Sequence, residues 1–137
     1  MVPQYKILWV EDYPMSIRRI KTELEKHIAE RGFSIEDEAI KVINDIDQFE
    51  YIINNSVSDY NLSLIAFDLG QIDIDETVLL KIIKTNKELS SKTVLYSSQY
   101  DNLQNQLQAN HIEHLKTSTR DELLYMLKKI ITATVKT

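Results

Sequence analysis

A chain of 137 residues, 43% hydrophobic and 27% charged, suits one ordered domain over residues 1–137 with a single sizeable core. With no cysteine and two glycines, it excludes disulfide frameworks, thiolate metal sites, Walker-type phosphate loops and dinucleotide fingerprints. The net charge of −5 disfavours direct binding of nucleic acid, and because the sequence contains no signal pattern and no bilayer-spanning run, we expect a cytoplasmic protein that does not enter a membrane.

The first half of the chain predicts two strand-and-helix pairs. The apolar run 7–10 predicts a strand with Trp9 in the core, and the amphipathic segment after it predicts a helix that Gly32 ends. The segment 39–43 is expected to be an edge strand, and Asp45 begins a short amphipathic helix. The apolar positions of these helices are Ile17, Ile20, Leu24 and Ile28 in the first, and Ile46, Phe49, Ile52 and Ile53 in the second.

The second half predicts three further pairs. The run that begins at Leu62 is apolar on both faces, which is typical of a strand covered by helices on both sides, and it ends on Asp68. The fourth strand is expected at 93–96 and a short fifth strand at 112–115. The helices that follow these three strands carry Val78, Leu79, Ile82 and Ile83; Leu103 and Leu107; and, after a capping box at Thr119 and Glu122, Leu123, Leu124, Leu127, Ile130 and Ile131.

Five alternations of strand and helix predict a doubly wound α/β fold. Right-handed crossovers place the carboxyl ends of all its parallel strands at one edge of the sheet, where such folds bind their ligands.

Polar residues follow four of the predicted strands at this edge. Glu11 and Asp12 follow the first strand, Asp68 the third, Ser97 the fourth and Lys116 the fifth. Like charges crowded at one place need a cation to stay ionised together, and three acids suit Mg²⁺. A cation and a lysine could together neutralise a phosphoryl group, and a serine could hydrogen-bond one of its oxygens.

With these five residues at successive expected positions, the sequence resembles the response-regulator receiver domains of two-component systems over residues 6–131. The resemblance implies a flavodoxin-like, five-stranded parallel sheet with strand order 2-1-3-4-5 and (βα)5 connectivity. It also implies a switch in a phosphorelay, in which Asp68 is the phosphoacceptor. A histidine kinase, a phosphotransfer protein or a small phosphodonor would supply the phosphoryl group.

The resemblance also assigns roles to the other residues. Asp12 and Asp68 would ligate Mg²⁺ directly, Glu11 would act through water, and the backbone carbonyl of Gly70 would complete the protein ligands.

Lys116 and Ser97 would hold the phosphoryl oxygens in this family's arrangement. Enzymatic activity would extend at most to self-phosphorylation from a donor and slow self-dephosphorylation. An output partner would dock on the face that the family forms from its fourth helix, fifth strand and fifth helix.

Several positions depart from the family pattern. The proline that follows the lysine is Thr117 here, and the aromatic switch of the fifth strand is replaced by Glu113 or His114, depending on where a one-residue gap falls. The phosphorylation site is kept, whereas the usual relay is altered. Three tyrosines near the edge are candidates for the missing aromatic: Tyr13, Tyr96 and Tyr100.

Two other hypotheses compete with a phosphorylated receiver. The first is a degenerate pseudo-receiver that docks partners without phosphorylation, which the altered relay favours. The second is a haloacid-dehalogenase-like phosphatase, whose nucleophilic aspartate also follows a strand. That family needs a second aspartate two positions later, where this chain has Gly70.

Overall fold

The computed structural model of the chain describes residues 3–11, 13–36, 38–67 and 76–134. These residues form a flavodoxin-like α/β fold around one parallel sheet with the strand order β2-β1-β3-β4-β5. The strands are β1 (Ile7–Val10), β2 (Ile40–Ile43), β3 (Leu62–Ala66), β4 (Thr93–Ser97) and β5 (Lys116–Thr119). The predicted fold class and strand order are confirmed.

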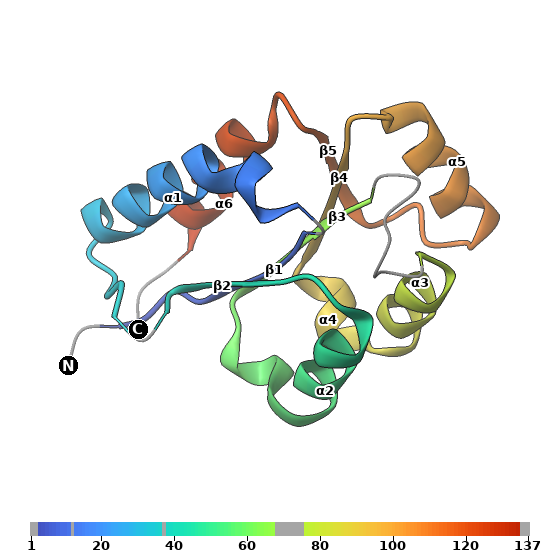
Figure 1. Cartoon of the computed structure of the whole chain (residues 1–137), viewed down its shortest axis with the longest axis horizontal. Helices are drawn as coiled ribbons and strands as arrows, with labels where there is room; N and C mark the ends of the chain where they lie inside the picture. The colour runs from blue at the N-terminus through green and yellow to red at the C-terminus, as the bar shows by residue number, and fades with distance from the viewer. Residues whose placement is uncertain (1–2, 12, 37, 68–75, 135–137) are drawn as a thin grey trace.

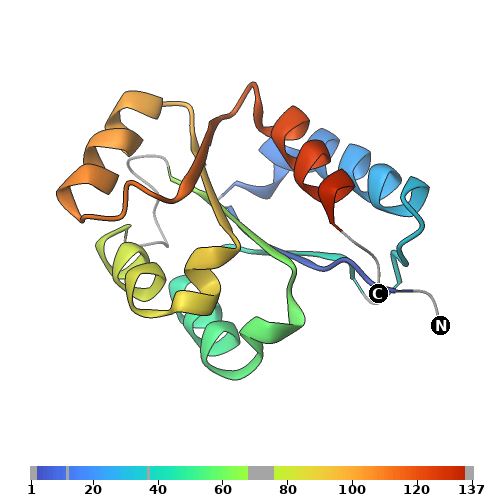
Figure 2. The ribbon, with the colours of Figure 1, turned by 180° about the vertical axis from the view of Figure 1, so that it is seen from behind.

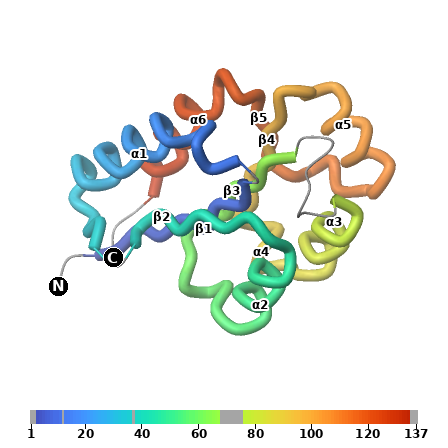
Figure 3. Tube along the Cα trace, viewed as in Figure 1, coloured from blue at the N-terminus to red at the C-terminus, as the bar shows by residue number. Residues whose placement is uncertain are grey.

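Helices cover both faces of this sheet (Figures 1 and 2). One face carries α1 (Arg18–Glu30) and α6 (Leu123–Ala133), which lie side by side (Figure 3). The other face carries α2 (Ile46–Ser56), α3 (Glu76–Thr85), α4 (Lys87–Ser91) and α5 (Tyr100–Ala109). Two short 3-10 helices, η1 (Pro14–Ile17) and η2 (Val57–Asp59), complete the described elements. No helix in the described ranges has the length and apolar character needed to cross a bilayer.

Each face of the sheet has its own apolar core. The core under α1 and α6 contains the largest buried side chains, including Trp9 and Tyr96. The core under α2 to α5 contains Phe49 together with aliphatic residues from the helices and from β1, β3 and β4. All residues of β1, β3 and β4 are buried, which explains why their sequences are apolar on both faces.

The helix ends follow the local sequence signals. Gly32 has a φ of 87°, and its amide donates to the carbonyl of Ala29, which ends α1 as predicted. The predicted start at Asp45 is confirmed, because Asp45 caps α2. The predicted capping residue of the last helix, Thr119, accepts a hydrogen bond from the amide of Glu122 at 3.2 Å, although α6 itself begins at Leu123.

The position of the fifth strand differs from the prediction. Residues 112–115 form a turn, in which the amide of Leu115 donates to the carbonyl of Ile112 at 3.2 Å. Both side chains are buried in the core under α5. The strand was predicted here because Ile112 and Leu115 are the apolar residues of this stretch. The real strand, β5, is a polar edge strand with the sequence KTST. Lys116 therefore begins β5 and does not end it.

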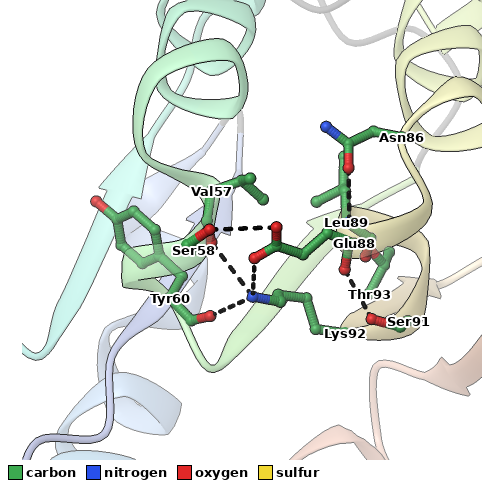
Figure 4. Close-up of polar contacts among 9 residues, drawn as sticks. All are labelled: Val57, Ser58, Tyr60, Asn86, Glu88, Leu89, Ser91, Lys92 and Thr93. Carbon is green, nitrogen blue, oxygen red and sulfur yellow. Dashed lines mark hydrogen bonds and ion pairs between the residues drawn. The ribbon is translucent and has the colours of Figure 1, made fainter.

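The short helix α4 was not predicted from the sequence. Asn86 caps it by accepting a hydrogen bond from the amide of Leu89 at 2.9 Å. Lys92 then fixes its position, because Nζ donates to the carbonyl of Tyr60 at 2.7 Å and to Oε2 of Glu88 at 3.3 Å (Figure 4). These contacts tie α4 to the segment before β3, at the end of the sheet opposite the carboxyl edge.

The cap of α2 gives a direct test of local stability. Oδ1 of Asp45 accepts a hydrogen bond from the amide of Gln48 at 3.0 Å. Asp45→Ala removes this acceptor, and we expect the free energy of unfolding in urea to fall by about 1 kcal/mol. Asp45→Ser keeps a capping oxygen and should lose clearly less; equal losses in the two variants would contradict the cap.

Candidate functional site

The carboxyl ends of the strands meet at one edge of the sheet because all neighbouring strands are parallel. The register places Ala66 beside Tyr96 and Ser97 beside Thr119. The amide of Phe67 donates to the carbonyl of Tyr96 at 2.8 Å, so the chain after β3 leaves the sheet beside the end of β4.

Two of the predicted site residues lie at this edge. Glu11 directly follows β1, and Ser97 is the last residue of β4. Both are buried. The other predicted ligands, Asp12, Asp68 and Gly70, lie outside the described residues.

Lys116 lies away from this edge, and its predicted place there is wrong. It pairs with Val94, near the start of β4, and its side chain is exposed. With about 3.3 Å per residue, it begins β5 roughly 10 Å along the strand from Thr119. The basic residue that follows β5 is Arg120.

Glu11 is the centre of the described site. Its exposed fraction is 2%, and hydrogen-bond donors surround its carboxylate. Oε1 accepts from the hydroxyl of Tyr96 at 2.8 Å and from the guanidinium of Arg120 at 2.9 Å. Oε2 accepts from the amide of Tyr13 at 3.0 Å. A buried carboxylate is costly without such partners, so these contacts compensate its lost hydration.

Tyr96 links this carboxylate to the core. Its hydroxyl accepts a hydrogen bond from Nε1 of Trp9 at 2.7 Å and donates to Glu11. The two rings pack edge to face, with centroids 6.3 Å apart. Burial, reinforced by the charge of Glu11, raises the pKa of Tyr96 well above its ordinary value. The phenol therefore stays protonated and keeps its donor for Glu11.

Arg120 closes the network from the solvent side. Its side chain is 27% exposed, and its guanidinium lies over the ring of Tyr96, with 5.2 Å to the centroid. Arg120 was not predicted as a site residue, because the fifth strand was expected at 112–115 and therefore too early in the chain. The sequence offers little signal for it, because the polar run 116–119 before Arg120 lacks the apolar alternation that predicts a strand.

Ser97 shapes the turn that leads into α5. Its Oγ accepts a hydrogen bond from the amide of Gln99 at 2.8 Å. The serine therefore lies at the predicted position, with its hydroxyl inside the edge where β4 ends.

The three candidate tyrosines differ in their surroundings. Tyr96 belongs to the Glu11 network, whereas Tyr13 is 67% exposed. The hydroxyl of Tyr100 lies 2.9 Å from Oγ1 of Thr117 and thereby connects α5 with β5.

A metal site needs several ligands close together, and the described residues alone do not supply them. They contain no group of three or more acidic or histidine side chains that could hold an ion. Glu11 is the one predicted ligand within the described ranges, and its Oε2 receives a single donor from them. A carboxylate oxygen can accept a second hydrogen bond, so this geometry fits contact with a cation through water.

A groove of about 710 Å³ follows β5 between α5 and α6. It is where Lys116 lies, together with the exposed ring of Tyr125. The full lining is Tyr100, Lys116, Thr117, Ser118, Thr119, Glu122, Tyr125, Met126, Lys129 and Ile130.

Comparison with protein-family models and with curated protein sequences finds no match to this chain. The function is therefore inferred from the fold and from the geometry of the carboxyl edge.

The bridge through Tyr96 can be tested by removing its hydroxyl. Tyr96→Phe leaves Nε1 of Trp9 and Oε1 of Glu11 each without one buried partner, and we expect the free energy of unfolding to fall by about 1–3 kcal/mol. The fluorescence of Trp9, the single tryptophan, should change in the folded protein.

Tyr51→Phe is the matched control, because Tyr51 is 70% exposed. It should leave both the stability and the fluorescence close to those of the unmodified protein. A Tyr96→Phe protein as stable as this control would contradict the bridge.

Proposed function

We propose that the protein is a phosphoacceptor receiver domain, in which Asp68 accepts a phosphoryl group from a histidine kinase or phosphotransfer protein. The observation that carries the proposal is the buried Glu11 carboxylate at the carboxyl edge of a parallel sheet with strand order 2-1-3-4-5. In such sheets ligands bind at this edge. Ser97 supports the proposal because it is the last residue of β4 and therefore lies at the same edge.

The proposed reaction is an in-line displacement at phosphorus. A carboxylate oxygen of Asp68 forms a bond to phosphorus, and the bond from phosphorus to the donor's nitrogen or oxygen breaks. The leaving group departs with the electron pair, and its charge is neutralised by a proton that solvent supplies or that the donor already carries. The product is an acyl phosphate on Asp68, which water can hydrolyse.

Mg²⁺ would be held by Asp12, Asp68 and the carbonyl of Gly70, with Glu11 acting through water. When bound, it would neutralise part of the charge that gathers on the phosphoryl oxygens. Ser97 would donate its hydroxyl proton to one of these oxygens, which draws the turn after β4 toward the modified aspartate. Lys116 has no part in this proposal, since it lies at the other end of β5.

A second candidate function is a pseudo-receiver that binds a partner protein without phosphorylation. It is favoured by the carboxylate network, because Oε1 of Glu11 is already satisfied by Tyr96 and Arg120. It is also favoured by the groove along β5, which has an exposed aromatic ring in Tyr125. On this hypothesis, Asp68→Asn would leave partner binding unchanged.

The proposed phosphorylation is tested by intact mass after incubation with phosphoramidate and Mg²⁺. The unmodified protein should gain the mass of one phosphoryl group, and the gain should disappear with a chelator. Asp68→Asn should abolish the gain, because an amide cannot act as the nucleophile.

Asp101→Asn provides a matched control, since Asp101 is an exposed acid in the first turn of α5. This variant should take up phosphate as the unmodified protein does. Phosphate retained on the Asp68→Asn protein would remove the basis of the proposal.

A further inference from the structure

A pocket of about 430 Å³ lies between the end of α3, the helix α4 and the turn that precedes β5. All three segments pack on the same face of the sheet (Figures 1 and 2). Two of its lining residues, Ser91 and His114, come shortly before the first residues of β4 and β5. Because these strands are parallel, the pocket lies at the amino-terminal edge of the sheet, away from Glu11 and the carboxyl edge.

The lining of this pocket is basic, although the whole chain has a net charge of −5. Its nitrogen-bearing side chains are Lys84, Lys87, His111 and His114. Among the described residues, no acidic side chain lines the pocket, and none of these four side chains forms an ion pair. The nearby carboxylate of Glu88 is engaged elsewhere, with Lys92 and Ser58. Two ammonium groups and two imidazole rings are therefore available to an anion.

We propose that this pocket binds a small phosphate-bearing anion, at a site that does not depend on Asp68. A lysine ammonium binds phosphate oxygens as a compact charge, and an imidazole ring offers an N–H donor whether or not it is charged. The volume lies within the range of small-molecule pockets, so it admits a pyrophosphate or a phosphate joined to a small organic group. The histidines lack the further ligands that a metal ion needs among the described residues.

The turn that carries the histidines is fixed by its backbone. The amide of His111 donates to the carbonyl of Gln108 at 3.2 Å. The amide of Ile112 donates to the carbonyl of Leu107 at 3.0 Å, which completes a Schellman motif at the end of α5. The side chains of Ile112 and Leu115 are buried in the core, whereas His111 is exposed at the pocket. The histidine ring is thus presented by an anchored turn.

The two serines of α4 fix the opposite wall. The hydroxyl of Ser90 donates to the carbonyl of Ile83, which ties α4 to α3. The hydroxyl of Ser91 donates to the carbonyl of Glu88 at 2.8 Å. Since both hydroxyl protons are already used within the protein, the groups that hold the anion are the lysines and the histidines.

His111 has an unfavourable backbone conformation for a residue with a side chain. Its φ is 59°, in the left-handed region that glycine adopts without strain. Glycine is also the usual residue at this position of a Schellman motif. A strained residue of this kind points to a role for its side chain, and the ring of His111 lines the basic pocket.

The test titrates the full chain with pyrophosphate and, separately, with ribose 5-phosphate, by isothermal titration calorimetry without divalent cations. The unmodified protein should bind one anion per chain, and Asp68→Asn should bind it equally well. Tighter binding of ribose 5-phosphate supports an organic phosphate as the ligand, and tighter binding of pyrophosphate supports an inorganic one.

Lys84→Gln and Lys87→Gln should each weaken binding about tenfold, the loss expected for one charge-assisted hydrogen bond. Lys81→Gln is the matched control, because Lys81 is an exposed lysine of α3 outside the lining. It removes the same charge from the protein and should bind as the unmodified chain does.

His111→Gly separates binding from a purely structural role. Glycine relieves the left-handed backbone, so the temperature of unfolding without ligand should not fall, whereas binding should weaken. A lower unfolding temperature with unchanged binding would show that His111 serves only the turn and would overturn its part in the site.

Three results would overturn the pocket as a whole. One is the absence of saturable binding with both anions at millimolar concentration. Another is unchanged binding in both Lys84→Gln and Lys87→Gln. The third is equal weakening in Lys81→Gln, which would reduce the effect to general charge attraction. Because Asp68 takes no part, each of these results leaves the proposed phosphorylation standing.

Discussion

A carboxylate buried at the edge of a parallel sheet is the constraint around which the described site is arranged. Glu11 cannot keep its charge out of water unless other elements bring donors to it. Its partners come from β4, from the residue after β5 and from the chain just after β1 itself. The hydrogen bonds of one side chain thus fix the relative positions of three strand ends. Apolar contacts lack the directionality that this requires.

This constraint also explains why side chains with polar atoms lie in one of the two apolar cores. A tyrosine and a tryptophan fill the core under α1 and α6, although each carries a polar atom. They fit there because the indole N–H of Trp9 and the hydroxyl of Tyr96 satisfy each other and then the carboxylate. Aliphatic residues of similar volume would fill the core equally well, but they would leave Glu11 short of a donor.

The parts of the fold that sequence reasoning predicted are those with strong physical signals. β1, β3 and β4 are buried on both faces and therefore apolar, and the start of α2 has a capping side chain at Asp45. β5 lacked any such signal, since a polar edge strand has no apolar alternation, and the buried Ile112 and Leu115 drew the prediction into the preceding turn. That shift of a few residues placed Lys116 at the wrong end of the strand. Glu11 and Ser97 were located correctly because their strands were.

The hydrogen-bond network connects the carboxyl edge directly to the core under α1 and α6. Glu11 bonds to Tyr96, and Tyr96 bonds to Trp9, which lies in the core between the sheet, α1 and α6. The groove along β5 is reached differently, through the contact of Tyr100 with Thr117. Among the described residues, the partners of the Glu11 carboxylate are Tyr13, Tyr96 and Arg120, and Thr117 is not one of them. A change in the charge around Glu11 therefore acts first on the packing beneath α1 and α6. Because close-packed cores have few voids to absorb a shift, these two helices are the elements whose position should respond to it.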